Sequence, residues 1–556
     1  MSVCIQYTRP ASGNTDSEIF GFDVAVTNLL SAWFRYGTAS QFICRPTDIP
    51  SFDHFKEMAA AAGVDAGARC IGLDPRHPEK NLQSIGCLFR PDPLTVDLMW
   101  RRQQMTGAGF ATCGLVHTMS GERIARAVGD MCAAPSDGAD ALICPSVSIR
   151  SAVHNLWDIH ADYLNHRFGG TFKCPVQTPI IPLGIDTDKF VRLTVPEKRM
   201  EQRAALGAAE DEVIILFVGR LSFATKAHPL PLFLAAERAA QVSGKKVRLV
   251  MYGYFKPRDM EPHFRNLAAD LCKTVRVEFV TNDDARFPDG LWAGADIFAS
   301  LSDNVQESFG LTPIEAMAAG LPAVISDWDG YREGVRNGID GYRVPTVTPQ
   351  PEAGMDIAAF YYNEENYGVA LSGAVQSTGI DIEYCTHAFN LLIGDAEKRR
   401  EMGNSGRARA QGVFDWKHII RAYEELWESL ADRRRNAPPP RAVPPNWQAV
   451  HPAYPNPWQM FADFPSMHLA PADILRVVMN ADEVETILRH EMNYFVPDLL
   501  LPKDGMRQLV SAIREAGSAR VADIFEPFPS SQRNRLQRCL GWMLKHGVCV
   551  MIRAQA

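Results

Sequence analysis

Glu307 and Glu315 are separated by seven residues, in a stretch whose composition suits the binding of a phosphate group. Residues 308–311 follow a predicted strand and precede a predicted helix with Thr312 as its N-cap and Pro313 as its first residue. The first backbone N–H groups of a helix are unpaired, and its dipole is positive at this end. We therefore expect this turn to bind a diphosphate, with the two carboxylates beside it.

A glycine and two cations, Gly219, Arg220 and Lys226, follow an apolar stretch of strand length. The glycine permits close approach of a ligand to the backbone. The arginine fork can bond two phosphate oxygens, and the lysine adds a mobile point charge. Together the two cations would stabilise the charge on a departing diphosphate without a metal ion.

The first half of the chain contributes two weaker candidates. Gly21 lies between the first predicted strand and the first predicted helix, where it would let the backbone approach a ligand. His117 follows a later predicted strand, at the edge where ligands bind in α/β sheets.

Each candidate also has a structural explanation. Glu315 could close a capping box with the hydroxyl three residues earlier. Glu307, Arg220 and Lys226 could be solvated surface charges, and a lone histidine such as His117 is more often structural than catalytic.

The pattern of the chain predicts a scaffold that brings these strand ends together. Apolar strands alternate with helix-length segments in two successive regions, which is typical of parallel sheets covered by helices on both faces. We expect two doubly wound α/β domains, residues 1–185 and 186–432. The expected strands are residues 2–8, 40–44, 70–73, 111–116 and 141–145 in the first domain, and 213–219, 247–253, 275–280, 295–302 and 321–327 in the second.

A proline-rich linker over residues 433–462 would lead to a small α+β domain over residues 463–556. The end of this domain reads as a helix, a turn at Gly547 and a strand, which resembles part of a winged-helix module. Acidic and basic residues balance there, so dimerisation or docking is expected rather than DNA binding. An insertion rich in aromatic residues lies at residues 355–381. It would either shape a cleft between the two α/β domains or form a contact between protomers of an oligomer.

Composition narrows the classes of function. The 556 residues carry 57 Lys and Arg against 65 Asp and Glu, a net charge of −8 that offers no basic field to nucleic acid. No apolar run approaches the ~20 residues of a membrane-spanning helix, and the N-terminus lacks the layout of a signal peptide. The 12 cysteines occur singly, which suggests neither a zinc site nor a disulfide framework. We expect a cytoplasmic protein, and peripheral membrane contact stays open.

Three features together resemble retaining glycosyltransferases of the GT-B fold, in particular family 4, the glycosyl transferases group 1. They are the glycine–arginine–lysine cluster at residues 219–226, the two glutamates with SFGLTPIEAMAAGLPAV within and after them, and the Phe-Asp-Trp start of a final helix at residue 414. The resemblance is most specific over residues 213–344 and 403–430, and it does not cover the linker or the C-terminal domain. It implies two Rossmann-like domains facing across a cleft, a UDP- or GDP-sugar as donor, and no metal or cofactor.

The resemblance also implies roles for the site residues. Arg220 and Lys226 would neutralise the leaving diphosphate, and Glu307 would lie beside the donor sugar. Glu315 would hold the ribose hydroxyls, and His117 would face the sugar from the acceptor domain. The remaining donor-binding positions would be Gly21, Gly219, Tyr254, Asn282, Ser308, Phe309, Gly310 and Leu311.

The implied activity is transfer of a sugar, with retention of configuration, to a glycan, a lipid-linked glycan, a protein or a small molecule. Front-face attack, in which the leaving phosphate takes the acceptor's proton, is favoured over a covalent adduct on Glu307. Two other functions are compatible with the same residues: a nucleotide-sugar 2-epimerase, and a non-catalytic scaffold whose C-terminal module binds a partner.

Overall fold

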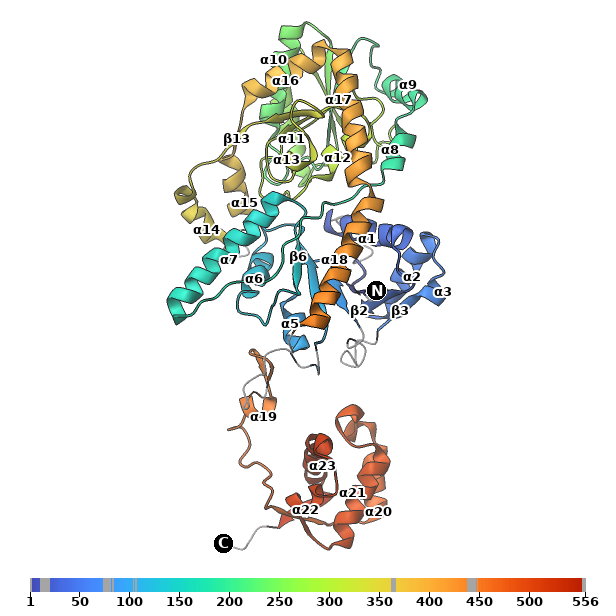
Figure 1. The fold of residues 1–556 in the computed structure, drawn as a ribbon, viewed down its shortest axis with the longest axis vertical. Coiled ribbons are helices and arrows are strands. Elements are labelled where there is room, and N and C mark those ends of the chain that lie inside the picture. The colour runs from blue at the N-terminus through green and yellow to red at the C-terminus, as the bar shows by residue number, and fades with distance from the viewer. Residues whose placement is uncertain are drawn as a thin grey trace. The chain divides into compact units, whose positions relative to one another are not determined.

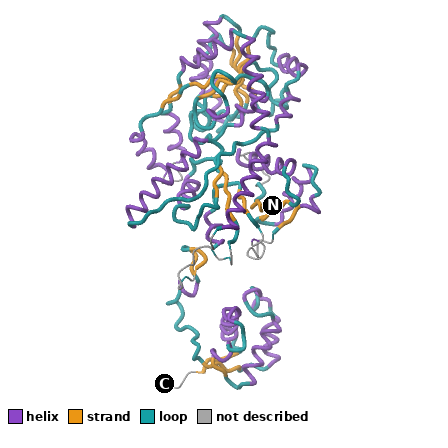
Figure 2. The backbone as a smooth tube through the Cα atoms, in the orientation of Figure 1, coloured by secondary structure: helices purple, strands orange, loops and turns teal. Residues whose placement is uncertain are grey.

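The computed structural model describes residues 3–10, 21–73, 82, 85–103, 105, 108–361, 367–437, 447 and 449–552. The chain divides into two compact units, Met1–Tyr454 and Pro455–Ala556. The larger unit contains two α/β domains (Figure 1), and each of their sheets lies between layers of helices (Figure 2). Within the described ranges, no helix is both long enough and apolar enough to cross a membrane.

The first domain is built on a parallel six-stranded sheet in the order β3-β2-β1-β4-β5-β6. Its strands are β1 (Val3–Tyr7), β2 (Phe42–Pro46), β3 (Cys70–Gly72), β4 (Cys87–Arg90), β5 (Ala111–Leu115) and β6 (Ala141–Ile143). Its helices are α1 (Gly21–Tyr36), α2 (Ile49–Ala61), α3 (Ala66–Arg69), α5 (Val96–Arg102), α6 (Glu122–Asp130) and α7 (Val147–Phe168). The strand order reverses between β1 and β4, which is the point where such sheets bind ligands.

The second domain repeats this topology, with the order β12-β11-β10-β7-β8-β9 and the reversal between β7 and β10. Its strands are β7 (Val213–Val218), β8 (Val247–Tyr252), β9 (Arg276–Val280), β10 (Ile297–Ser300), β11 (Ala323–Ser326) and β12 (Gly341–Val344). Its helices are α8 (Thr187–Leu193), α9 (Pro196–Ala205), α10 (Pro229–Ser243), α11 (Glu261–Leu271), α12 (Leu311–Ala318), α13 (Tyr331–Gly334), α16 (Ile382–Gly394) and α17 (Ala396–Arg409). The two Rossmann-like domains that we expected are therefore both present.

The chain crosses between the two domains twice, and the two crossings are hydrogen-bonded to each other. The backbone N–H of Ile185 donates to the carbonyl of Phe414 at 2.9 Å, and that of Trp416 donates to the carbonyl of Ile185 at 3.2 Å. The side chains of Thr187 and Asp415 add a further hydrogen bond. This paired segment is the connection between the two domains, and hinge motion around it is a prediction.

Helix α18 (Trp416–Asn436), which we expected to close the second domain within residues 186–432, packs instead into the first domain (Figure 1). Its apolar face lies against α1, β4 and β5. Trp427 is 1% exposed and its ring lies 5.9 Å from that of Trp33. The apolar stripe of α18 covers one face of the first sheet. The second domain therefore ends near residue 415, and the following helix belongs to the first domain.

The described residues of the insertion after β12 include two α-helices. They are α14 (Met355–Tyr361) and α15 (Tyr367–Gln376), flanked by the antiparallel strands β13 (Thr346–Val347) and β14 (Gly379–Ile380). Met355 is 76% exposed, and Tyr362 lies outside the described residues. A role of this insertion in self-association stays a prediction.

The smaller unit contains a three-stranded antiparallel sheet in the order β18-β17-β19. Its main elements are β17 (Ile474–Val477), α20 (Ala481–Arg489), α21 (Lys503–Glu515), β18 (Ala519–Arg520), α22 (Val521–Phe525), α23 (Arg533–Lys545) and β19 (Cys549–Ile552). The expected final helix, Gly547 turn and strand are present as α23, a glycine with φ of +70° and β19. The partner strand of β19 precedes the helices, and the winged-helix assignment stays a prediction.

In the residues that the structure describes, the linker region after α18 contains short elements. They are β15 (Ala449–His451), β16 (Tyr454–Pro455) and α19 (Pro457–Met460). Helix α18 extends to Asn436, so the first residues of the predicted 433–462 linker are helical, and residues 438–446 and 448 lie outside the described part.

Candidate active site

The candidate residues of the second domain converge at the point where its strand order reverses. Lys226 lies in the loop after β7 and Glu307 in the loop after β10, and these strands are neighbours in the sheet. Lys226 Nζ lies 2.5 Å from Glu307 Oε2. Their side chains are 17% and 16% exposed, so this ion pair is largely withdrawn from solvent.

The loop that carries Lys226, residues 219–228, is held by the strand ends on both sides. The N–H of Leu221 donates to the carbonyl of Tyr254 at 2.8 Å. The carbonyl of Lys226 accepts hydrogen bonds from Asn304 Nδ2 at 2.5 Å and Ser302 Oγ at 3.3 Å. The backbone of the lysine is therefore fixed by the segment that leads to Glu307.

Lys226 is charged in this site. Burial alone would lower the pKa of its ammonium group, but the Glu307 carboxylate and the Tyr331 hydroxyl raise this pKa above its usual range. An ammonium group has three N–H donors. One donates to Glu307 and a longer contact of 3.5 Å reaches the Tyr331 hydroxyl.

Gly253 was not predicted as a site residue, and its role follows from the close approach of its backbone to that of Gly219. Gly253 has a φ of +159°, and a Cβ atom on it would lie 1.8 Å from the carbonyl oxygen of Gly219. Any side chain at Gly253 would push the loop of Arg220 and Lys226 away from β8. The signal in the sequence was the glycine that ends the stretch at residues 247–253.

Helix α12 begins two residues earlier than expected. Gly310 is its N-cap with φ of +84° and ψ of +88°, and Leu311 is its first residue. Thr312 is therefore not the N-cap, Pro313 is not the first residue, and the capping box between residues 312 and 315 is wrong. The left-handed conformation open to glycine allows the earlier start.

This start leaves the amides of Leu311 and Thr312 without acceptors inside the helix, because the first N–H groups of a helix point out of its end. Together with the helix dipole they favour a negative charge at this end, and diphosphate binding here stays a prediction. We call residues 307–311, which lead into this end, the donor loop.

Glu315 lies on the second turn of α12 and is half-buried. Burial raises the pKa of its carboxyl, and the positive charges of Lys189 and Lys226 oppose that rise. Glu315 thus lies within the field of the same lysine that pairs with Glu307. Its proposed contact with ribose hydroxyls stays a prediction.

Arg220 is turned toward its own loop. Its Nη2 donates to the carbonyl of Thr225 at 3.0 Å, while its buried Nε has no hydrogen-bond partner among the described residues. The guanidinium therefore shapes the turn that presents Lys226 and keeps one unused donor.

The donor loop presents backbone rather than large side chains. Phe309 is 2% exposed and packs in the core, with its ring 5.9 Å from that of Phe414. Ser308 is 7% exposed, and its carbonyl accepts a hydrogen bond. Tyr254, after β8, is 41% exposed, and Asn282, after β9, is exposed at the same edge of the sheet. A role of these last two residues in binding the base stays a prediction.

Two further carboxyls, Asp303 in the loop after β10 and Asp329 in the loop after β11, were not predicted. Burial raises the pKa of Asp303 to about 7. Burial, followed by the negative charge of Glu307, raises the pKa of Asp329 to about 8. Each has an Oδ1 atom that is buried without a hydrogen-bond partner in the described part of the chain. The raised pKa favours the protonated form of Asp329 near neutral pH.

His117 lies at the carboxyl end of β5 in the first domain. Its Nε2–H donates to the carbonyl of Pro91 at 2.9 Å. Burial lowers its pKa to about 4, against smaller opposing effects of this hydrogen bond and of Asp92. The ring is therefore neutral at physiological pH. Gly21 is the first residue of α1, and residues 11–20 ahead of it lie outside the described residues.

The first domain touches the donor loop directly. Ser146, the N-cap of α7, donates from Oγ to the carbonyl of Ser308 at 2.9 Å. The N–H of Val147 donates to Glu333 Oε1 at 2.5 Å. These contacts join residues far apart in the sequence, so no local motif could have indicated them.

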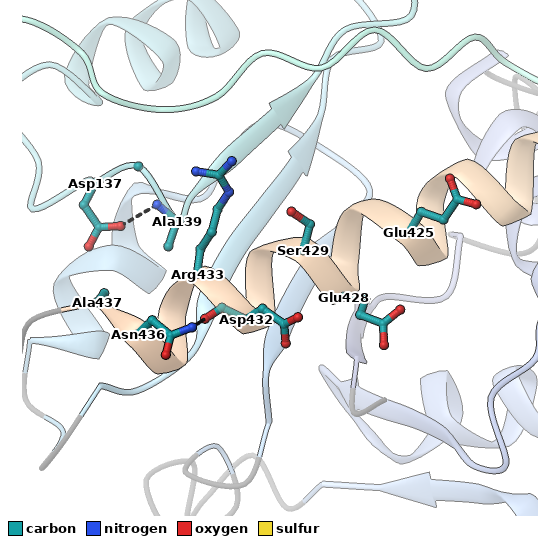
Figure 3. Close-up of a pocket in the computed structure, with 10 residues that line it drawn as sticks. Asp137, Ala139, Glu425, Glu428, Ser429, Asp432, Arg433, Asn436 and Ala437 are labelled. Carbon is teal, nitrogen blue, oxygen red and sulfur yellow. Dashed lines mark hydrogen bonds between the residues drawn. The ribbon is translucent and has the colours of Figure 1, made fainter.

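A cavity of about 860 Å³ lies elsewhere, between α18 and the loop before β6 (Figure 3). Its lining includes Asp137, Glu425, Glu428, Asp432 and Arg433. This loop precedes β6 and so lies at the amino edge of the first sheet, whereas His117 lies at the carboxyl edge. The cavity is therefore separate from the candidate active site. In the part of the chain that the structure covers, no group of three or more His, Cys, Asp and Glu residues is placed to hold a metal ion.

Residues 198–367 match the model of a family described as Glycosyl transferases group 1. The chain is 29% identical over 289 residues to the D-inositol 3-phosphate glycosyltransferase of Geodermatophilus obscurus, a match that covers 49% of this chain and 53% of that protein. It is 34% identical over 172 residues to the protein of the same name from Mycobacteroides abscessus. That match covers 31% of this chain and 36% of that protein. The chain thus spans about half the length, or less, of the curated relatives it matches.

The chain can also be compared with a solved structure. HepE from Anabaena, in a complex with UDP, is 16% identical with a TM-score of 0.49, over 77% of this chain and 100% of that chain. The region matched by the family model contains Arg220, Lys226, Glu307 and Glu315. This part of the chain is therefore similar to the group 1 glycosyltransferases.

Proposed function

We propose that this protein is a retaining glycosyltransferase that moves a sugar from a UDP- or GDP-sugar to the hydroxyl of an acceptor. The observation that carries the proposal is the Lys226–Glu307 ion pair at the N-terminal end of α12, where the strand order of the second sheet reverses. A cation, a carboxylate and free helix amides are the groups that a sugar diphosphate needs.

The difficult step is charge separation, because the anomeric carbon becomes positive while the diphosphate becomes more negative. Lys226, the unused Nε donor of Arg220 and the amides of Leu311 and Thr312 would stabilise that negative charge without a metal ion. Lys226 would turn one of its N–H groups to the phosphate while Glu307 moves to the sugar. The leaving oxygen would then take the proton of the attacking hydroxyl, and the new bond would form on the face that the diphosphate leaves.

His117 would contact the sugar from the first domain as a neutral ring. Its low pKa favours a hydrogen-bonding role over that of a cation. The acceptor would enter from the side of the first domain. Because two relatives carry the name D-inositol 3-phosphate glycosyltransferase, we include that compound among the acceptors to be tested.

All twelve cysteines are free in the structure, which fits a reducing compartment, and we place the activity in the cytoplasm. We also retain the proposal that the smaller unit or the 355–381 insertion mediates self-association. Gel filtration with light scattering, on the full chain and on a chain without residues 455–556, tests the first of these two surfaces.

The function itself is tested by thermal denaturation with UDP-, GDP- and ADP-sugars, followed by product analysis with and without acceptors. A bound donor raises stability by RT ln(1 + [L]/Kd), about 2.7 kcal/mol at 100 times Kd. We expect one nucleotide class to stabilise the protein and slow hydrolysis of the donor without an acceptor. A free epimerised sugar would identify an epimerase instead, and no stabilisation by any donor would contradict the proposal.

A further inference from the structure

Glu333 in the second domain accepts a hydrogen bond from the N-terminus of a helix in the first domain. The N–H of Val147 lies 2.5 Å from Glu333 Oε1. One residue earlier, Ser146 Oγ donates to the carbonyl of Ser308 in the donor loop at 2.9 Å. From these contacts we infer that Glu333 is a positioning residue, which holds the first domain against the donor loop in the geometry of sugar transfer. The inference rests on the proposed function.

The N-terminus of α7, where the Glu333 carboxylate lies, favours a negative charge. Helix α7 has 22 residues, and Ser146 caps it by accepting from the N–H of Ile149 at 3.1 Å. The Glu333 carboxylate adds a charged acceptor at the positive end of the same helix. Burial raises the pKa of Glu333, and hydrogen bonds from the N–H groups of Val147 and Ser148, with the charges of Arg332 and Arg150, oppose that rise.

Glu333 stands on a fixed base within the second domain. It belongs to α13, a helix of four residues. Arg409 of α17 donates to the backbone carbonyls of Glu333 and Gly334, both at 2.9 Å. The backbone that carries the Glu333 carboxylate is therefore tied to α17.

The same short helix reaches the donor site through Tyr331. Its hydroxyl lies 3.0 Å from Ser300 Oγ and 3.5 Å from Lys226 Nζ, and the residue is 1% exposed. Helix α13 thus has one side chain at the catalytic lysine and another at the opposite domain. Helix α13 therefore links the position of the first domain to the position of Lys226.

The residue that this contact positions is His117. Strands β5 and β6 are neighbours, with Leu115 opposite Ile143. His117 follows β5 by two residues and Ser146 follows β6 by three, so both lie at the same edge of the first sheet. Holding the start of α7 against the donor loop therefore also holds the edge that carries His117.

The test uses the full chain and the variants Glu333→Ala and Glu333→Gln, with Glu210→Gln as a control at an exposed position of the same domain. Hydrogen exchange of the peptide around residues 146–150 reports the contact itself. UDP and GDP binding by calorimetry, and separate kcat and KM values with the preferred donor, report its effect on the reaction.

We expect Glu333→Ala to speed exchange at the start of α7 by about tenfold, the effect of losing one hydrogen bond to a charged group. The amide oxygen of Glu333→Gln still accepts, so that variant should fall between wild type and Glu333→Ala. Affinity for the nucleotide and KM for the donor should stay within about twofold, while kcat falls. Glu210→Gln should behave as wild type.

Unchanged exchange in Glu333→Ala would overturn the inference, because the contact would then not hold α7. Loss of nucleotide binding in that variant alone would also overturn it, by placing Glu333 in the donor site. Faster exchange across the whole chain would show general destabilisation instead of positioning. If wild type binds neither nucleotide, the proposed function fails, and the exchange measurement still decides whether the contact exists.

Discussion

The ring of Tyr331 lies directly against Gly310, so that a Cβ atom on Gly310 would sit 2.0 Å from Tyr331 Cε1. Gly310 caps the helix that would bind the diphosphate, and Tyr331 also contacts the amine of Lys226. The two parts of the donor site, helix end and cation, are therefore packed on one buried side chain.

Gly310→Ala should damage both stability and activity. The new methyl group meets Tyr331, and alanine at a φ of +84° adds strain of about 1–3 kcal/mol. We expect a loss of at least this size in the free energy of unfolding, measured with denaturant, and a larger loss of donor binding. Gly368→Ala is the matched control, because a Cβ atom there meets nothing within 4 Å, and it should be near neutral. Wild-type binding by Gly310→Ala would contradict the assignment of the donor loop.

Lys226→Met should reduce turnover by ~10²–10³, which is the effect of removing one donor that stabilises a developing anion. Arg220→Ala should show a similar loss, because it contributes the second cation and shapes the loop through Thr225. Steady-state rates with saturating donor measure both effects, and Lys245→Met, at an exposed position, controls for loss of charge. Nearly full activity of both variants would show that the diphosphate binds elsewhere.

Glu315→Gln tests the proposed ribose contact. A hydrogen bond to a charged group contributes about 1.5–3 kcal/mol, so affinity for UDP or GDP should fall by roughly 10- to 100-fold. The same variant should bind the 2′,3′-dideoxy nucleotide as well as wild type does, because that ligand lacks the hydroxyls. Calorimetry with both ligands gives the comparison. An equal loss for the two ligands would place Glu315 away from the ribose.

Asp329→Asn should change how stability depends on pH. The pKa of Asp329 is raised from about 3.8 to about 8, so between these values the folded protein keeps a proton that the unfolded chain releases. The contribution of this residue to stability therefore falls as pH rises from 4 to 8, by at most about 1.4 kcal/mol per pH unit. The asparagine variant should lack this decline and tolerate the φ of +45° at this position.

Denaturant midpoints between pH 5 and 9 measure the difference between wild type and Asp329→Asn. Asp289→Asn, at an exposed position, is the control. Parallel curves for wild type and Asp329→Asn would mean that Asp329 does not titrate in this range.

Trp427→Ala should destabilise the first domain although Trp427 follows the second domain in the sequence. Its side chain is buried against Trp33 and Phe89, and such truncations cost about 3–5 kcal/mol. Exchange rates of amides in β1, β4 and β5 should rise, while those in β7 and β8 should not. Equal effects on both domains would contradict the assignment of α18 to the first.

Most of the fold could be predicted because its strands are continuous apolar runs. The β-branched stretches at residues 213–219 and 247–253 are confirmed as β7 and β8 within one residue. Strand β4 was missed because Cys87–Arg90 is only four residues long and lies directly before a proline. The start of α12 was placed two residues late because threonine is a commoner N-cap than glycine, whereas here Gly310 caps the helix in a left-handed conformation.

The pairing of site residues could be predicted only in part. Strand–loop positions indicated that Lys226 and Glu307 lie at the same edge, since parallel strands share their carboxyl ends. The contact between Ser146 and Ser308 spans 162 residues of sequence, and the destination of α18 depends on which domain offers an apolar groove. Neither spacing nor periodicity encodes such choices, because both arise only when the domains meet.

Because α18 packs into the first domain, the core of that domain cannot be completed until late in synthesis on the ribosome. Residues up to about 181 emerge first, but their core lacks Trp416, Tyr423 and Trp427 until a second complete domain has followed. At roughly 5–20 residues per second, synthesis of the intervening segment takes on the order of 10–50 seconds. During that interval the nascent first domain exposes an aromatic groove, which a chaperone can occupy before the chain's own helix does.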